Sequence, residues 1–358
     1  GLYHPLGLKV VNGEVFVTCR DGIWKLRDTN GDGEADAYEA FNFDVMVTKN
    51  FHEFVFDLQT DAAGNFYFIK AGPVRKGGRG FDEICDHHGV LFKVSPDGKR
   101  SETFATGFRA PNGIGISPSG QLTTGDNEGT WTPMCRLNWV KQGGFYGVVD
   151  LAHRTAPPAD YDRPLCWFPK EVDNSSGGQV WVTSDKWGPL SGKMLHTSYG
   201  ACALFAVLHE TIDGVAQAGT WKFPLKFDTG IMRGRMHPTN GQLYLCGLSA
   251  WATSQTEQEG GFYRLRPTGQ PATLPTAWHI LADGIELTFS EPLSVATVSD
   301  LARYTVKVWE LKRSANYGSP RINEHALPVT RATALADPRQ VRLTIPSLAP
   351  TAIIELTC

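Results

Sequence analysis

The chain has 358 residues, which is enough for two domains, because single hydrophobic cores stop growing well before that length. Charged residues make up 20% and hydrophobic residues 41%, as in ordinary globular proteins. The formal net charge of -3 gives no electrostatic basis for binding nucleic acid or an anionic membrane. No stretch approaches the roughly 18 consecutive apolar residues of a membrane span, so none is predicted in this segment.

The first predicted elements are three antiparallel strands joined by tight turns. The strands are Leu8–Val11, Val15–Thr18 and Ile23–Leu26, and the turns are Asn12-Gly13 and Asp21-Gly22. Asn-Gly and Asp-Gly supply the positive φ angles that two-residue hairpins require. The pattern therefore predicts a meander of short strands at the start of the chain.

Similar groups of short strands and glycine-containing turns recur four more times. They begin near Phe54, Asn112, Gly178 and Arg233. Units of three or four strands that repeat every fifty to sixty residues or so are typical of propeller blades. We therefore predict an all-β fold containing a β-propeller. The alternative is one large β-sandwich, which would show less similarity between its units.

The composition changes after the fifth group of strands. Pro267–Pro275 is rich in Pro, Thr and Gly and reads as a linker. Apolar and polar residues then alternate in Ile285–Phe289, Tyr304–Val308 and Val341–Ile345, with no helical stripe. This pattern predicts an immunoglobulin-like β-sandwich. We expect a β-propeller over residues 1–267 and the sandwich over residues 268–358.

Residues 28–39 match the spacing of a calcium-binding loop, with Gly33 at the sharp turn. Calcium takes six to eight oxygen ligands, and the loop offers oxygens at every expected position. The candidate ligands are Asp28, Asn30, Asp32, Glu34, Asp36 and Glu39. Strands rather than helices flank the loop, so a structural calcium ion is expected. The alternative is a solvated acidic turn.

Polar residues stand at or near the starts of successive predicted inner strands. They are His52, Arg109, Asn112, Arg233 and Arg235. In a propeller these strands line the central channel, so their leading residues meet at one mouth. Grouped cations need an anion between them, and arginine binds carboxylates bidentately. The pattern predicts a site for a polyanionic cofactor or substrate. The alternative is separate pairing of each arginine with Glu53, Asp126 or Asp228.

The seven cysteines are scattered singly along the chain. None forms Cys-x-x-Cys or Cys-x-x-Cys-His, which excludes haem attachment and a zinc ribbon within this segment. One or two disulfides are compatible with the number, and Cys135–Cys166 is the first candidate pair. The alternative is that most of the cysteines are small buried hydrophobic residues.

Three segments resemble the soluble quinoprotein glucose, aldose and sorbosone dehydrogenases. They are Gly107–Ile116 (GFRAPNGIGI), Gly125–Gly129 (GDNEG) and Leu137–Gly147 (LNWVKQGGFYG). The resemblance continues in order through His52 and Arg233-Gly-Arg235, and covers roughly residues 4–267.

A second set of segments is similar to the so-called membrane-bound dehydrogenase propellers of bacterial cytochrome-fused proteins. The segments are Pro5–Leu8, Asp28–Asp36 and Asp173–Gly178. The quinoprotein family has six blades where five are visible here, so we expect one blade to precede Gly1.

The resemblance implies a dehydrogenase that oxidises a sugar or other alcohol and depends on pyrroloquinoline quinone (PQQ) and calcium. It implies a periplasmic or secreted protein whose electrons pass to a cytochrome-type acceptor. By this resemblance His52 is the general base and Arg109 stabilises charge on the reduced cofactor. The implied cofactor-binding residues are Arg109, Asn112, Arg233 and Arg235.

Two departures from the family pattern keep other functions open. The family has a lysine that contacts the cofactor in the strand that reads Leu195-His196-Thr-Ser-Tyr199-Gly here, and this strand contains no lysine. The family's Arg-Asn pair reads Arg109-Ala110, which leaves Asn112 as a displaced candidate. One alternative is a non-catalytic, calcium-stabilised propeller that binds a glycan or a protein. The other is a calcium-dependent hydrolase or lactonase.

Overall fold

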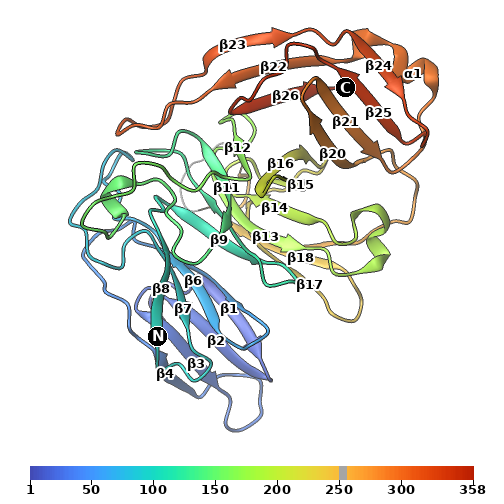
Figure 1. The fold of residues 1–358 in the computed structure, drawn as a ribbon. Helices are drawn as coiled ribbons and strands as arrows, with labels where there is room; N and C mark the ends of the chain where they lie inside the picture. Colours follow the sequence, from blue (N-terminus) through green and yellow to red (C-terminus); the bar gives the residue numbers. More distant parts are fainter. Residues whose placement is uncertain (250–255) are drawn as a thin grey trace.

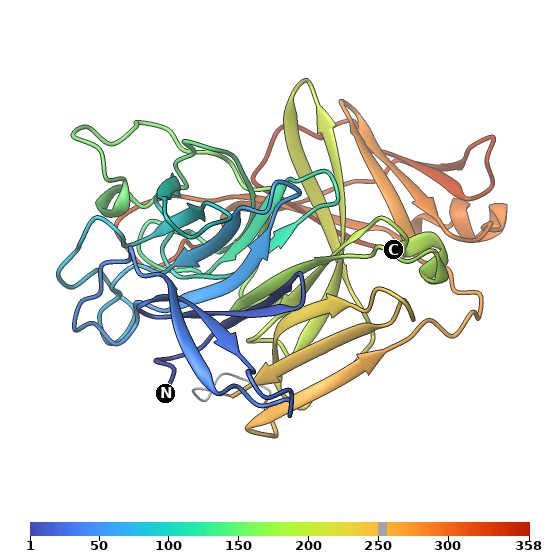
Figure 2. The same ribbon diagram turned by 90° about the horizontal axis from the view of Figure 1, so that it is seen from below.

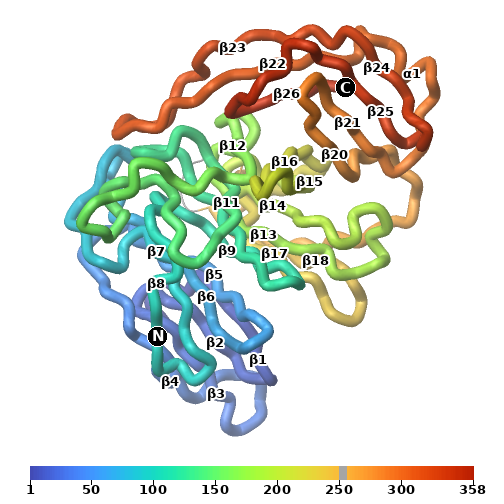
Figure 3. The backbone as a smooth tube through the Cα atoms, viewed as in Figure 1, coloured from blue at the N-terminus to red at the C-terminus, as the bar shows by residue number. Residues whose placement is uncertain are grey.

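The computed structural model describes residues 1–249 and 256–358. Its strands form seven antiparallel sheets, so the predicted all-β fold is confirmed (Figure 1). The chain passes from one sheet to the next in sequence order, and its N-terminus lies far from the last sheets (Figure 3). No helix among the described residues is long and apolar enough to cross a membrane.

Five sheets form in chain order, and within each one every strand pairs with the next. The first two contain β1 (Gly7–Val11), β2 (Glu14–Cys19), β3 (Gly22–Arg27) and β4 (Ala37–Asn42), then β5 (Val55–Thr60), β6 (Phe66–Lys70), β7 (Val90–Val94) and β8 (Ser101–Thr106). The third contains β9 (Pro111–Ile116), β10 (Leu122–Asp126), β11 (Cys135–Val140) and β12 (Cys166–Phe168), with the short helix η1 (Val149–Leu151) between the last two. The fourth contains β13 (Ser176–Trp181), β14 (Met194–Ser198), β15 (Ala203–Ile212) and β16 (Val215–Lys222), with the short helix η2 (Asp185–Leu190) between the first two. The fifth contains β17 (Gly230–Met236), β18 (Leu243–Leu248) and β19 (Gly260–Leu265).

The first strands of these sheets pack on one another in succession, β1 on β5, β5 on β9, β9 on β13 and β13 on β17. This arrangement is that of propeller blades around an axis, and Figure 2 shows the sheets following one another in this way. At the axis, a Cβ on Gly113 would lie 2.6 Å from the Cα of Gly178. Two glycines therefore let β9 and β13 approach closely. The predicted β-propeller, with five blades in this chain, is confirmed.

The last two sheets pack face to face around a shared apolar core that includes Leu287, Val306 and Leu343. One contains β20 (Pro275–Leu281), β21 (Gly284–Phe289), β25 (Gln340–Thr344) and β24 (Arg331–Ala334); the other contains β23 (Ile322–Leu327), β22 (Thr305–Glu310) and β26 (Ile353–Thr357). Two short helices, α1 (Val295–Ser299) and η3 (Leu301–Arg303), precede β22. The predicted sandwich is therefore present, while the division of domains at residues 267 and 268 stays a prediction.

The hairpin of β15 and β16 connects the fourth blade to the sandwich. The Trp278 Nε1 donates to the Leu208 carbonyl at 2.5 Å, and His279 Nδ1 lies 2.7 Å from the carboxylate of Glu210. On the neighbouring strand, Trp221 Nε1 donates to the Pro275 carbonyl at 3.0 Å. The sandwich is thus bonded directly to the outer strands of a blade.

The proposed Cys135–Cys166 disulfide is wrong, because all seven cysteines, each within the described residues, are free. The register explains this result: β11 and β12 pair Cys135 with Phe168, and Leu137 with Cys166. The two thiols are therefore two residues out of register, whereas a disulfide needs closely opposed Cβ atoms. Cys135 is fully buried among apolar side chains, as the alternative expected.

Candidate functional site

A buried carboxylate occupies the axis of the propeller. Asp57 lies in a bulge where the pairing of β5 with β6 shifts between Phe56 and Gln59, and its φ is +61°. Bulges re-aim side chains, and this one aims Asp57 at the fifth blade. Arg235 Nη2 lies 2.9 Å and Arg233 Nε 3.2 Å from the two carboxylate oxygens.

Backbone groups from neighbouring inner strands complete the contacts of Asp57. Its oxygens accept hydrogen bonds from the Leu58 N–H at 2.8 Å and the Ile114 N–H at 3.0 Å. Burial alone would raise the pKa of Asp57, but the charges of Arg235 and Arg233 outweigh it and hold the pKa below its ordinary value. The carboxylate therefore stays ionised and bonds the second, third and fifth blades together.

Asn112 joins the same group. Its Oδ1 accepts from Arg233 Nη1 at 2.9 Å, and its side chain is 5% exposed. The structure thus brings together three of the predicted residues, Asn112, Arg233 and Arg235. The anion between the two arginines is Asp57, so their proximity alone does not require an external anion.

Arg109 lies apart from this group, in the segment that leads into β9. Its side chain is buried, and Nη2 donates to the Gly78 carbonyl at 2.8 Å. Among the described residues no carboxylate lies within 4 Å of its guanidinium, and its buried Nε has no hydrogen-bond partner. Burial lowers the pKa of Arg109. Arginine nevertheless stays protonated in proteins, so the buried group is a cation. A buried guanidinium without a carboxylate partner is costly unless an anion pairs with it, so Arg109 is a candidate binding group for an anionic ligand.

His52 lies near Arg109, whose charge acts on its imidazole. Its backbone N–H donates to Asn50 Oδ1 at 2.6 Å, and its ring lies against Phe54 with centroids 5.5 Å apart. Burial, followed by the charge of Arg109, lowers the pKa of His52 to about 4. The imidazole is therefore neutral near pH 7, which is the form that can accept a proton.

The acidic partners expected for separate pairing of the arginines are used differently. Glu53 is buried with Arg20, Lys70 and His88, and Lys70 Nζ lies 2.9 Å from its carboxylate. Burial alone would raise the pKa of Glu53, but hydrogen bonds from His88, Lys70 and Arg20 hold it well below its ordinary value.

Asp126 accepts from the backbone N–H groups of Arg109 and Ala110, at 2.8 and 2.7 Å, rather than from a guanidinium. Asp228 makes no ion pair with any of the three arginines among the described residues. The partner that the sequence did not suggest is Asp57.

His196 lies in the strand where the quinoprotein resemblance led us to look for the family's lysine. It is fully buried, with Nε2 2.9 Å from Asp173 Oδ2 and Nδ1 3.1 Å from Gln179 Nε2. Ser198 donates to the other Asp173 oxygen at 2.6 Å. These hydrogen bonds hold β13 against β14 and leave His196 in the interior of the fourth blade.

The predicted calcium loop connects β3 and β4 and is exposed. Asp28 accepts from the N–H groups of Gly31 and Gly33, at 2.6 and 2.9 Å, and Asn30 and Asp32 accept in the same way from residues two positions later. Asp36 accepts from the Thr29 N–H and hydroxyl. The loop is therefore folded around its own acidic side chains.

Two observations limit the fit of this loop to calcium. Glu39 lies on β4, where its carboxylate is 2.9 Å from Arg27 Nε, and does not join the other candidate ligands. Over residues 1–249 and 256–358, no three His, Cys, Asp or Glu side chains gather closely enough to hold a metal ion. The loop supplies oxygen donors of the right kind without drawing them together.

A cavity of about 480 Å³ lies away from these residues, beside the outer strand β8. His87, Phe104, Thr106 and His153 are among its lining residues. None of the residues predicted from the sequence lines this cavity.

Two residues of the site were missed from the sequence. Tyr317, in the segment joining β22 and β23, covers Arg109, with its ring centroid 5.4 Å from the guanidinium carbon. Glu128, just after β10, is close enough that its charge acts on both Arg109 and Tyr317. Burial raises the pKa of Glu128. The GDNEG motif contains Glu128, but nothing in the sequence indicated Tyr317.

No family model and no curated protein matches this chain. Solved structures do. A glucose dehydrogenase is 15% identical, with 75% of this chain and 84% of that chain covered at a TM-score of 0.52. The PQQ-bound aldose sugar dehydrogenase of Streptomyces coelicolor is 13% identical, with 69% and 89% covered at 0.40. A gluconolactonase from Xanthomonas campestris is 16% identical, with 66% of each chain covered at 0.36. The chain therefore has the β-propeller fold found in a glucose dehydrogenase, as its sequence resemblance predicted.

Proposed function

We propose that this chain is a dehydrogenase that oxidises a hydroxyl group of a sugar or other alcohol, with PQQ as its cofactor. The observation that carries the proposal is the pairing of two side chains. The neutral imidazole of His52 lies near the buried guanidinium of Arg109, which makes no ion pair among the described residues. A base and an anion-stabilising cation at one site are what alcohol oxidation requires of a protein.

The residues fit a quinone cofactor at two points. The Arg109 Nε is a buried donor without a partner among the described residues, and the Arg235 side chain is 41% exposed while it pairs with Asp57. Asn112 and Arg233 would contribute at the axis, although Asp57 already holds Arg233. When bound there, PQQ would supply the two-electron acceptor for the hydride that leaves the carbon carrying the hydroxyl.

In this proposal the protein handles the proton and the charge. His52 takes the proton of the substrate hydroxyl on a ring nitrogen as the carbon–hydrogen bond breaks. Such positioned bases contribute typically about 10²–10⁴-fold to rate. Arg109 stabilises negative charge with a group that is already desolvated, so little reorganisation is needed during the reaction.

Calcium in the loop of residues 28–39, a cytochrome-type electron acceptor, and a periplasmic or secreted location belong to the same proposal. Asp28, Asn30, Asp32 and Asp36 offer the oxygen donors that calcium prefers. We give the ion a structural role, because the loop is exposed on the outer strands of the first blade.

The experiment is dye reduction by the purified protein after incubation with PQQ and calcium chloride, tested on a panel of aldoses and polyols. We expect substrate-dependent reduction that disappears in His52→Ala. Absence of dye reduction with every substrate would overturn the proposal.

A binding function is the second candidate, and the Asp57 ion pair favours it. Asp57 pairs with both Arg233 and Arg235, so the residues at the axis are held together by contacts within the chain. In that case the propeller would bind a glycan or a protein without PQQ, and the dye-reduction assay would show no turnover. Hydrolysis of an aldonolactone in the same assay would instead support a hydrolase.

A further inference from the structure

The loop between β22 and β23, residues 311–321, leaves the sandwich and lies on the propeller (Figure 1). The Trp131 N–H donates to the Ser314 carbonyl at 2.8 Å, and the Gly318 N–H donates to the Gly129 carbonyl at 3.1 Å. Tyr317 itself forms a β-bridge with Thr130. These backbone bonds fix the loop on the segment that follows β10.

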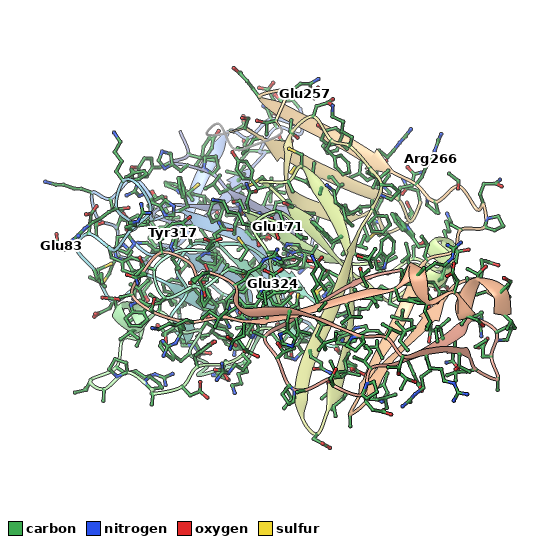
Figure 4. All side chains as sticks on the ribbon, turned by 90° about the horizontal axis from the view of Figure 1, so that it is seen from above. Glu83, Glu171, Glu257, Arg266, Tyr317 and Glu324 are labelled. Atoms are coloured by element: carbon green, nitrogen blue, oxygen red, sulfur yellow. The ribbon has the colours of Figure 1, made fainter. Side chains whose placement is uncertain are left out.

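Arg313 provides a second attachment. Its Nη1 donates to the Gly147 carbonyl at 2.6 Å, and its guanidinium lies over the rings of Trp131 and Tyr161, at 5.4 and 4.9 Å. At the base of the loop Arg321 contacts both Glu171 and Glu324, which are labelled in Figure 4. The loop is thus attached along its length rather than resting on the propeller at one point.

Two guanidinium groups lie near the ring of Tyr317. Its ring centroid is 5.6 Å from Arg79 and 5.4 Å from Arg109. A Cβ on Gly78 would lie 3.0 Å from the tyrosine ring, and one on Gly129 would lie 1.8 Å from Arg109 Nε. Glycines at these two positions therefore make room for the aromatic ring and the buried cation.

This corner holds two guanidinium groups that make no direct ion pair among the described residues. Among the described residues neither Arg79 nor Arg109 has a carboxylate within 4 Å, and Lys76 in the same glycine-rich segment is exposed without an ion pair. The carboxyl groups of Asp126 and Glu128 act on Arg109 from beyond that distance, and burial raises the pKa of both. Tyr317 remains 41% exposed, so part of its ring is open to a ligand.

We propose that Tyr317, supplied by the sandwich, and the guanidinium groups of Arg79 and Arg109 form a subsite for a sugar that carries a carboxylate, such as a uronate. The tyrosine face packs against the sugar's C–H groups, and the guanidinium groups bind the carboxylate. This inference rests on the proposed function, whose substrate it narrows to acidic sugars.

The test is isothermal titration of the full-length protein with D-glucuronate and with D-glucose at one ionic strength. We expect glucuronate to bind at least tenfold more tightly, Arg109→Gln to remove that preference, and Tyr317→Ala to weaken glucuronate binding at least tenfold. Tyr317→Phe should bind as the parent does. Tyr38→Ala, which removes a tyrosine on β4 that is 50% exposed, should also leave binding unchanged.

Equal affinity for the two sugars, or glucuronate binding unaffected by Tyr317→Ala, would overturn the inference. Displacement of glucuronate by an equal concentration of sulfate would reduce the site to a simple anion site and overturn the sugar assignment. Dye reduction separates this outcome from the proposed function. Turnover of neutral aldoses together with glucuronate binding that Tyr317→Ala does not weaken would reject only the subsite. Glucuronate binding that Tyr317→Ala weakens, without turnover of any sugar, would reject only the dehydrogenase.

Discussion

Removing the charge of Asp57 should destabilise the whole propeller. Asp57→Asn keeps the shape of the side chain but leaves Arg233 and Arg235 without a counter-ion. Loss of one partner of a buried ion pair typically costs about 3–5 kcal/mol. The Arg235 side chain is 41% exposed and can turn to water, whereas that of Arg233 is only 12% exposed. We therefore expect the lower end of that range, about 3 kcal/mol.

This loss can be measured by urea denaturation and by thermal melting. At about 2.1 cal/mol/K per residue, a cooperative unit of 358 residues changes its Tm by roughly 1.3 °C for each kcal/mol, so the expected drop is about 4 °C. Asp86→Asn, at an exposed position, is the matched control. The double variant Asp57→Asn/Arg233→Gln should lose less than the sum of the single losses. An Asp57→Asn protein within about 0.5 kcal/mol of the parent would refute the role assigned to this carboxylate.

Three further predictions concern the site and the loop. His52→Ala should lower holoenzyme turnover by two or more orders of magnitude with cofactor affinity nearly intact, whereas Arg235→Ala should mainly weaken cofactor binding; equal, modest losses in both would contradict the assigned base. The folded-state pKa of His52 is lowered to about 4, so the unfolded chain binds a proton first as the pH falls from about 6.5 towards 4. The free energy of unfolding should therefore decrease across that window by up to about 3 kcal/mol. Denaturation curves of His52→Gln should show a smaller decrease with pH. If the loop of residues 28–39 binds calcium only when folded, a hundredfold excess over Kd should raise Tm by roughly 3 °C, and chelator should reverse it; an unchanged Tm would remove calcium from the loop.

The fold could be predicted because its signals are local. Asn12-Gly13 and the alternation of apolar and polar residues after Gly284 act over a few residues, and the hairpin of β1 and β2 and the sandwich strand β21 that they predict are present. The strands that were missed, such as β8 and β12, are outer strands with polar or short sequences. Their pairing depends on a neighbouring strand that the local pattern does not reveal.

The site was predicted only in part, because its contacts join distant segments. Arg233, Arg235 and Asn112 were identified by their places near the starts of predicted inner strands, and the structure brings these three residues together. Asp57 could not be identified, because a bulge rather than the alternation of the strand turns it to the axis. Tyr317 could not be identified either, since it reaches the propeller from a separate pair of sheets.

The hydrogen bond from Arg235 to Asp57 spans 178 positions in the chain, whereas each blade is built from neighbouring strands. Contacts of such sequence separation form slowly, because closing a long loop has a large entropic cost before the contact is made. Individual blades can therefore form early, with the bond across the axis among the last to be made. On this order of events Asp57→Asn should leave the refolding rate nearly unchanged and accelerate unfolding. The axis would then set how long a folded molecule persists, rather than how quickly it arises.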